Sequence, residues 1–188
     1  KGDIVTTVPS GGGSSNRTPI VSNTPSFRAT LGADQMLSNY TRTAVAFGAE
    51  DFDSDGCYNN TGSTVTLNGI SVPAYSFAPN VAGFYYVFAS TSIECSADHI
   101  KFARIQICKN GGDNIMAACV SGLDAADPST TVVSWEMTQT VSMIIEMNGT
   151  SDYITIFTDA TRGSGNSSTL KLNDTTVRNY VQAYKLIM

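Results

Sequence analysis

Hydrophobic and polar residues alternate along most of the chain beyond residue 25, and this period of two predicts β-strands with one buried face. No amphipathic helix of useful length is predicted. Clusters of Gly, Asn and Asp separate the expected strands, which are residues 26–31, 40–47, 74–78, 84–89, 100–109, 115–121, 131–147, 153–159 and 176–187. Nine or ten short strands of this kind predict an all-β antiparallel sandwich, and their spacing favours a jelly roll.

The most apolar part of the pattern is FAPNVAGFYYVF at residues 77–88, where Pro79 and Gly83 interrupt two aromatic runs. Pro79 is expected to end the first strand, in which Tyr75 and Phe77 alternate with smaller residues. The second strand is apolar on both faces from residue 84 to residue 89, which predicts an interior position in a sheet.

The same residues carry a family resemblance. Phe77, Gly83 and Tyr85, preceded by Phe52-Asp53 and Tyr58-Asn59, resemble the signature of the C1q/TNF-like jelly-roll domain. RIQICKNG at residues 104–111 is similar to a strand and turn of that family, and residues 143–156 are similar to one of its hairpins. The resemblance covers residues 26–188 and implies a C1q/TNF-like jelly roll of about ten strands, with Phe52 in its core.

The chain departs from the family pattern at two positions. Val87 and Ala89 stand where the family usually has aromatic residues, so the core must be filled differently. The wording of residues 52–83 resembles the versions found in tailed-phage and other virion appendage proteins more than those of mammalian complement.

The resemblance also implies a homotrimer that packs through a sheet containing the last strand. This strand is apolar on both faces, and a monomer would leave one of them exposed to water. The expected trimer interface consists of Val181, Ala183, Ile187 and Phe88.

Residues 1–25 are predicted to form an extended tail outside the jelly-roll domain. Pro9 to Ser15 reads PSGGGSS, a flexible linker composition, and Pro19 and Pro25 keep the rest extended. The chain starts without Met and shows no leader, which suggests a piece of a longer polypeptide. The apolar residues expected to dock the tail onto a partner's sheet edge or groove are Ile4, Val5, Val8, Ile20 and Val21.

Composition narrows the choice of partners. The formal net charge is −5, only 14% of residues are charged, and there is no basic run, which argues against a nucleic-acid partner. No stretch approaches the ~20 apolar residues of a membrane span, so membrane insertion is not expected. A chain of 188 residues is long enough to form one stable core without a disulfide or metal.

The acidic sequence at residues 51–56 suggests one metal hypothesis. Asp51, Asp53 and Asp55 precede Gly56 as in the first half of a calcium loop, but the twelfth position is Gly62 rather than Glu. The alternatives are a Ca²⁺ site and a solvated acidic turn. No other cofactor is predicted.

Four cysteines leave the disulfide state open. Cys119 is expected opposite a residue at least four before Cys108, roughly 13 Å away along the strand, which is too far for a disulfide. Cys57 and Cys95 both lie beside turns and could meet. Four buried or half-buried thiols are the simpler interpretation.

The sequence gives little support for catalysis. His99, the single histidine, lies in a polar loop beside Asp98, where Ser, His and Asp could not converge as a triad. Glu136 and Glu146 are expected on one face of one strand about 33 Å apart, whereas glycosidase carboxylates lie within about 10 Å. A non-enzymatic protein is predicted.

These observations favour a trimeric structural or binding module on a virion surface, such as a fibre, head decoration or receptor-binding knob. The tail would attach to another virion protein, and surface loops would bind a host-surface receptor or glycan. The alternative is a secreted trimeric C1q/TNF-like ligand or lectin-like pattern-recognition module. Six N-x-S/T sequons favour this alternative, at Asn16, Asn39, Asn59, Asn148, Asn166 and Asn173.

Overall fold

The computed structural model describes residues 22–96, 100–122, 135–162, 169–174 and 178–187. These residues form no helix, and every strand pairing among them is antiparallel. The strands are β1 (Ser26–Thr30), β2 (Gln35–Leu37), β3 (Thr43–Ala44), β4 (Ala49–Asp53), β5 (Val65–Leu67), β6 (Ile70–Val72), β7 (Ser76–Phe77), β8 (Gly83–Cys95), β9 (Ile100–Lys109), β10 (Ile115–Gly122), β11 (Glu136–Met147), β12 (Ile154–Arg162), β13 (Leu170–Leu172) and β14 (Tyr180–Lys185). The predicted all-β antiparallel sandwich is confirmed.

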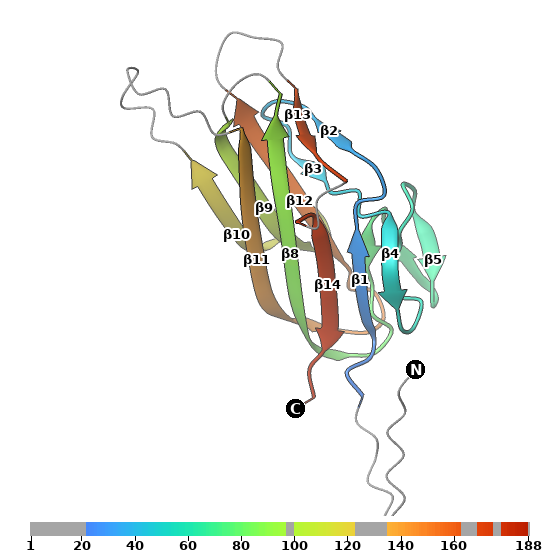
Figure 1. Ribbon diagram of the computed structural model, residues 1–188. Helices are drawn as coiled ribbons and strands as arrows, with labels where there is room; N and C mark the ends of the chain where they lie inside the picture. Colours follow the sequence, from blue (N-terminus) through green and yellow to red (C-terminus); the bar gives the residue numbers. More distant parts are fainter. Residues whose placement is uncertain (1–21, 97–99, 123–134, 163–168, 175–177, 188) are drawn as a thin grey trace, which may run out of the picture.

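The front sheet faces the viewer in Figure 1 and has seven strands around the long strand β8. Its order is β2-β13-β8-β14-β1-β4, and β11 pairs with the other edge of β8 along its whole length. On the edge of β8 that faces away from β11, β14 pairs with residues 85–90 and β13 pairs with residues 93–95. The predicted interior position of this strand is therefore correct.

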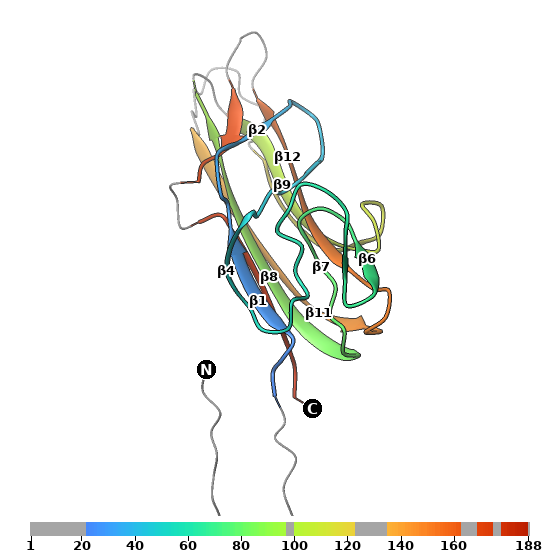
Figure 2. The same ribbon diagram turned by 90° about the vertical axis from the view of Figure 1, so that its right-hand side faces the viewer.

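The back sheet lies behind the front sheet, as the side view in Figure 2 shows. Its order is β10-β9-β12-β3, and β7 also pairs with β12. Strands β5 and β6 form a separate two-stranded ribbon. The start of β1 and the end of β14 lie together, because the Lys185 N–H donates to the carbonyls of Asn23 and Pro25.

The core between the two sheets contains a group of stacked aromatic rings. Phe27 lies between Tyr58 and Phe77, with ring centroids 4.3 and 4.6 Å from its own. Tyr85 packs edge-on against Phe77 at 5.7 Å. The buried Tyr58 hydroxyl donates to the Phe47 carbonyl, and the Tyr85 hydroxyl donates to the Val81 carbonyl. Val87 and Ala89 are smaller than the aromatic residues that the family usually has at these positions. Rings from β1, β7, β8 and the segment before β5 fill the core instead.

Three details of the predicted strands were wrong. Phe52 is 50% exposed, because β1 and β4 pair it with the outward-facing Arg28. Tyr75 has a φ of 52°, so the short strand begins only at Ser76. Phe84 is also 36% exposed, and one face of the first half of β8 is therefore open. The expected strand at residues 40–47 is reduced to β3, and the one at residues 84–89 extends over the whole of β8. Five extra strands of three to five residues lie within connections that read as turns, which raises the number of described strands to fourteen.

All four thiols are free. Cys57, Cys95 and Cys108 are buried, and Cys119 is half-buried. Cys119 lies opposite Ile105, which is three residues before Cys108 rather than four or more, because a bulge near the start of β10 shifts the register.

The turn between β11 and β12 is held by the carboxylate of Asp152, which is 7% exposed. It accepts hydrogen bonds from the Asn110 side chain at 2.7 Å and the Asn148 N–H at 2.9 Å, and it pairs with Lys109 at 2.8 Å. Burial alone would raise the pKa of Asp152, but these donors together hold its pKa below the ordinary value of 3.8. The charged form is therefore the one that stabilises the fold.

Acid is expected to remove this stabilisation. Because the folded pKa lies below the unfolded value, the contribution is complete above about pH 5 and falls as the pH drops below about 4. We expect Asp152→Asn to lower the free energy of unfolding at pH 7 and to lose this difference from wild type at about pH 2. Urea unfolding of both proteins between pH 2 and pH 7 measures it, and a difference that does not change with pH would contradict the assignment.

Candidate functional site

The outward surface of the front sheet carries a group of aromatic and aliphatic side chains that we call the aromatic face. Side chains alternate between the two faces of a strand, so the odd-numbered residues of β8 and β11 face the core and their even-numbered residues face outward. The corresponding outward positions of β14 are also even-numbered. The aromatic face consists of Phe84, Tyr86, Phe88, Ile144, Tyr180 and Tyr184.

Strand register brings these side chains side by side. Tyr86 lies opposite both Tyr184 on β14 and Ile144 on β11. The rings of Tyr86 and Tyr184 are 5.5 Å apart, and those of Phe88 and Tyr180 are 5.4 Å apart and stacked. The aromatic face is therefore continuous across three strands.

The aromatic face remains open to solvent. Ile144 is 53% exposed, Tyr184 37% and Phe84 36%. Arg28 of β1 lies over the Tyr180 ring at 5.2 Å and borders the patch with a cation. A continuous exposed group of aromatic side chains with a polar border is typical of protein interfaces.

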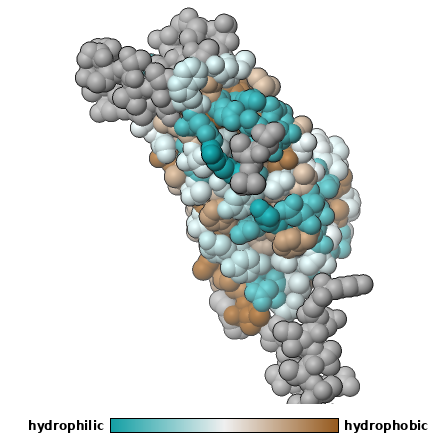
Figure 3. Space-filling model, in the orientation of Figure 1, coloured by the Kyte–Doolittle hydropathy of each residue, from teal (hydrophilic) through white to brown (hydrophobic). Residues whose placement is uncertain are grey.

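The other end of the same sheet is polar. In Figure 3 the largest hydrophilic area lies in the upper half of this surface, whereas hydrophobic and hydrophilic residues are mixed toward its lower end. Ser92 donates its hydroxyl to Glu136, and Arg178 forms an ion pair with the same carboxylate. The Arg178 guanidinium, followed by the Ser92 hydroxyl, holds the pKa of Glu136 below its ordinary range. This end is thus a hydrogen-bonded polar network.

The expected trimer-interface residues are divided between two environments. Val181 and Ala183 are 3% and 1% exposed and belong to the core, so they cannot contact another copy in this fold. Phe88 lies on the aromatic face, and Ile187, just beyond β14, is 49% exposed. The outward side chains of β14 are instead Tyr180, Gln182 and Tyr184.

The structure does not assemble the predicted calcium ligands. Asp51 forms an ion pair with Arg28 at 2.8 Å, and Asp53 accepts the Tyr58 N–H at 2.7 Å. Asp55 accepts the hydroxyl of Ser54. Within the ranges that the structure describes, no three His, Cys, Asp or Glu residues are grouped so that they could hold a metal ion. The acidic residues here organise the β4 turn.

The remaining candidate residues have mixed positions. The tail residues Ile4, Val5, Val8, Ile20 and Val21 lie outside the described residues, as does His99. Ser92 is buried within β8. Glu136 and Glu146 occupy the two ends of the unbroken strand β11 on its outward face, as predicted.

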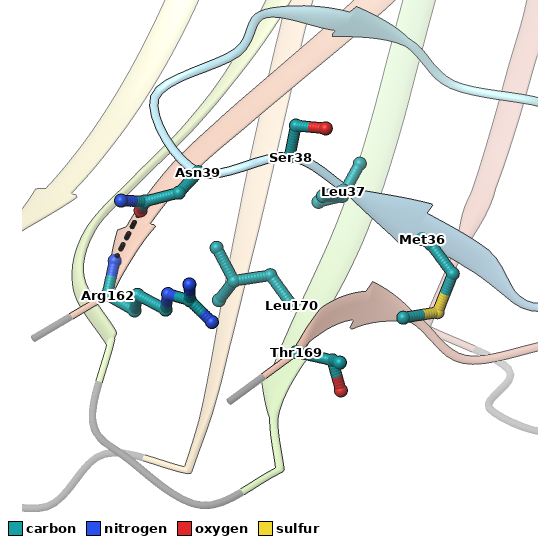
Figure 4. A pocket seen from close by; sticks show the side chains of 7 residues that line it. All are labelled: Met36, Leu37, Ser38, Asn39, Arg162, Thr169 and Leu170. Carbon is teal, nitrogen blue, oxygen red and sulfur yellow. Dashed lines mark hydrogen bonds between the residues drawn. The ribbon is translucent and has the colours of Figure 1, made fainter. Parts of the chain in front are cut away.

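A shallow depression lies where β2 and β13 meet the end of β12 (Figure 4). Met36, Leu37 and Leu170 line its apolar side, and Asn39 and Arg162 line its polar side. The Arg162 N–H donates to the Asn39 side-chain oxygen at 3.0 Å, which fixes the β2–β3 connection against β12. We assign no ligand to this depression.

Comparison with known proteins supports the fold alone. No protein-family model and no curated protein matches the chain. Among solved structures, murine APRIL at pH 5.0 aligns with a TM-score of 0.55 and 9% identity over 86% of this chain and 98% of that one. Eiger TNF from S. frugiperda aligns with a TM-score of 0.50 and 9% identity, covering 86% and 90%. The chain therefore has a TNF-like jelly-roll fold. Within the described ranges no helix is long and apolar enough to cross a membrane.

Proposed function

We propose that this chain is a non-enzymatic binding module that acts as a homotrimer, and that its copies pack through the aromatic face. The observation that carries this proposal is the exposure of Phe84, Ile144 and Tyr184 on strands whose opposite side is fully packed. Covering these side chains removes apolar surface from water at about 25 cal/mol per Å². A second surface of the same kind is the natural cover, because aromatic residues are enriched in the buried centres of interfaces.

Threefold symmetry is supported by a likeness in sequence and a likeness in fold. The sequence resembles the C1q/TNF-like family at Phe77, Gly83 and Tyr85, and the fold is similar to those of murine APRIL and Eiger TNF. One sheet surface from each of three copies would then meet around a common axis. In this arrangement the Glu136–Arg178 network would form the polar end of each interface.

The non-enzymatic part of the proposal is supported by how the polar residues are used. Ser92 belongs to the polar network described above. It is 1% exposed, and its hydroxyl is hydrogen-bonded to the side chains of Glu136 and Thr138. Asp51 and Asp159 are engaged in ion pairs with Arg28 and Arg104. These groups stabilise strands and leave no open acid, base or nucleophile among themselves.

Within this class we propose a position on the outside of a virion. The supporting observation is the likeness of residues 52–83 to virion appendage proteins, together with a tail at residues 1–25 whose composition suits attachment to another virion protein. The jelly roll would then bind a host-surface receptor or glycan. Electron microscopy of the native particle with labelled antibody to this chain tests the position, and unlabelled particles would exclude it.

The second candidate is a secreted trimeric ligand or pattern-recognition module. It is favoured by the similarity in fold to APRIL and Eiger TNF and by the six sequons. N-linked glycans on protein purified from its native source would support this candidate, because a virion protein made in a bacterium should carry none.

The trimer proposal makes a direct prediction for Tyr184→Glu. This change places a charge at the centre of the aromatic face in each copy, and we expect it to weaken association about 100-fold or more while the monomer stays folded, since Tyr184 is already 37% exposed. Sedimentation velocity at micromolar concentration measures the change from trimer to monomer.

Val120→Glu is the matched control, because Val120 is 57% exposed on β10 of the back sheet. It should leave the trimer intact. A monomeric wild type, or equal dissociation of both variants, would contradict the assignment of the interface to the aromatic face.

A further inference from the structure

The N-x-S/T sequons differ sharply in whether the folded chain could carry a glycan. N-linked glycosylation adds a bulky polar group to the side-chain nitrogen of Asn, so that nitrogen needs open space. Four sequon asparagines are described, Asn39, Asn59, Asn148 and Asn173, whereas Asn16 and Asn166 lie outside the described residues.

Asn39 presents its side-chain nitrogen to solvent. It lies in the exposed connection between β2 and β3, and its oxygen accepts the Arg162 N–H at 3.0 Å. Figure 4 shows the Asn39 oxygen, and not its nitrogen, on the hydrogen bond to Arg162. Among the described residues this nitrogen has no hydrogen-bond partner. The oxygen contact therefore fixes the amide of an exposed residue and leaves its nitrogen unused by the described residues.

The residues after Asn39 keep the sequon accessible. The Thr41 N–H donates to the Ser38 carbonyl at 3.1 Å and closes a tight turn. Tyr40 stands in this turn with a φ of 60° and is 75% exposed. Its exposed ring belongs to the residue next to Asn39 and offers a flat apolar surface to which a sugar on Asn39 has access.

Asn59 is the opposite case. It is 2% exposed, and its side-chain nitrogen donates to three carbonyls, those of Ser63, Val72 and Pro73, at 2.8 to 3.1 Å. Its oxygen accepts both the N–H and the hydroxyl of Thr61 at 3.0 and 2.7 Å. A sugar on this nitrogen would remove a hydrogen that these bonds use and would have to occupy space filled by the protein.

The remaining two side chains are engaged in hydrogen bonds, Asn148 within its own turn and Asn173 with the distant strand β8. Asn148 donates its nitrogen to Ser151, and its oxygen accepts the N–H groups of residues 150–152. Asn173 donates to the Glu94 carboxylate at 3.0 Å. At both positions the side-chain nitrogen already donates a hydrogen bond within the protein, which is not so at Asn39.

We propose that Asn39 is a site of N-linked glycosylation and that the Asn59 sequon stays unmodified in the folded protein. The donor is an oligosaccharide joined through its anomeric carbon to a lipid diphosphate. The Asn39 nitrogen forms a bond to that carbon as the carbon–oxygen bond to the diphosphate breaks. The bonding electrons leave with the diphosphate, and the amide gives up one proton. This proposal rests on the secreted-module candidate, because a virion protein made in a bacterium would carry no N-linked glycan. It does not depend on the trimer interface, because the β2–β3 connection contributes no residue to the aromatic face.

The test is expression of the full chain through a eukaryotic secretory pathway, with glycopeptide mass spectrometry of the soluble protein. We expect occupancy of the Asn39 peptide to exceed that of the Asn59 peptide at least tenfold. Two matched variants that remove only the sequon threonine, Thr41→Val and Thr61→Val, sharpen the comparison. Thr41→Val should lower the intact mass by one glycan, and Thr61→Val should change it only by the substitution itself.

Two results would overturn the proposal. One is an Asn39 peptide that carries no glycan, and the other is soluble, cooperatively melting protein with a glycan on Asn59. The wild-type map decides both outcomes even if Thr61→Val folds poorly. Comparing the melting of each variant made without glycosylation in bacteria separates the loss of a glycan from the loss of the Thr61 hydrogen bond.

Discussion

Replacing Gly149 by alanine is expected to lower the free energy of unfolding by roughly 3 kcal/mol or more. Gly149 follows β11 and has a φ of 72°, a left-handed conformation that strains an L-residue by about 1–2 kcal/mol. A Cβ atom at this position would also lie 2.5 Å from the Ala82 nitrogen and 2.8 Å from the Val81 carbonyl carbon. Both are backbone atoms of the turn before β8, so the overlap cannot be relieved by a side-chain rotation.

Gly69→Ala separates the strain of the left-handed backbone from the steric overlap of the Cβ atom. Gly69 has a φ of 80°, but a Cβ there would meet nothing within 4 Å, so only the backbone strain should appear. We expect a loss of about 1 kcal/mol at Gly69 and at least twice that at Gly149 in urea unfolding. Equal losses at the two positions would show that the close approach of the turns is not what requires glycine.

Phe27→Ala is expected to destabilise the protein by about 3–5 kcal/mol. Phe27 is 1% exposed and lies between the rings of Tyr58 and Phe77, so its removal leaves a cavity that three separate segments border. Chemical denaturation measures the loss.

Phe52→Ala is the control for the aromatic residue type. Phe52 is on the neighbouring strand β4 and is 50% exposed, so we expect its replacement to change the free energy of unfolding by less than about 0.5 kcal/mol. If Phe52→Ala proved as costly as Phe27→Ala, the core would be centred differently from the ring stack described above.

Long strands could be predicted from the sequence, because their alternation extends over many residues. The predicted strand at residues 100–109 coincides with β9, and the start of β10 was also correct. Strands of two or three residues, such as β2 (Gln35–Leu37) and β13 (Leu170–Leu172), are too short to show a period. They form because Leu37 and Leu170 can be buried beside the end of β8, which is a tertiary effect.

The side of the sheet available for association could not be read from one strand. Both faces of the last strand are apolar, and the expected interface included Val181 and Ala183. Strand register places Val181 beside Ala89 and Ala183 beside Val87, and all four side chains are buried in the core between the sheets. The larger rings of Tyr86 and Tyr184 consequently lie on the outside. The alternating aromatics at residues 84, 86 and 88 were the available signal, but residue 85 is aromatic too.

The sequence also could not indicate which glycine is required for steric reasons. The sequence drew attention to Gly83 because it follows a tight connection, and its φ is 147°. A Cβ at Gly83 would meet the end of the flexible Lys185 side chain at 2.8 Å, whereas the contact at Gly149 is with backbone. Only the approach of two turns that are distant in sequence distinguishes the two glycines.

The division of one edge of β8 between two partners bears on the timescales of local opening. Backbone pairing with β14 ends at Ser90 and pairing with β13 starts at Ile93. Across this gap the Ser92 N–H is bonded by the side-chain oxygen of Asn179 at 2.7 Å, and Asn179 also donates to the Asn173 carbonyl. A single asparagine side chain stands in for the backbone pairing at this break. Because no backbone bond joins β13 to β14 across it, we expect the amide hydrogens of β13 to exchange with solvent without opening of the β14 pairing.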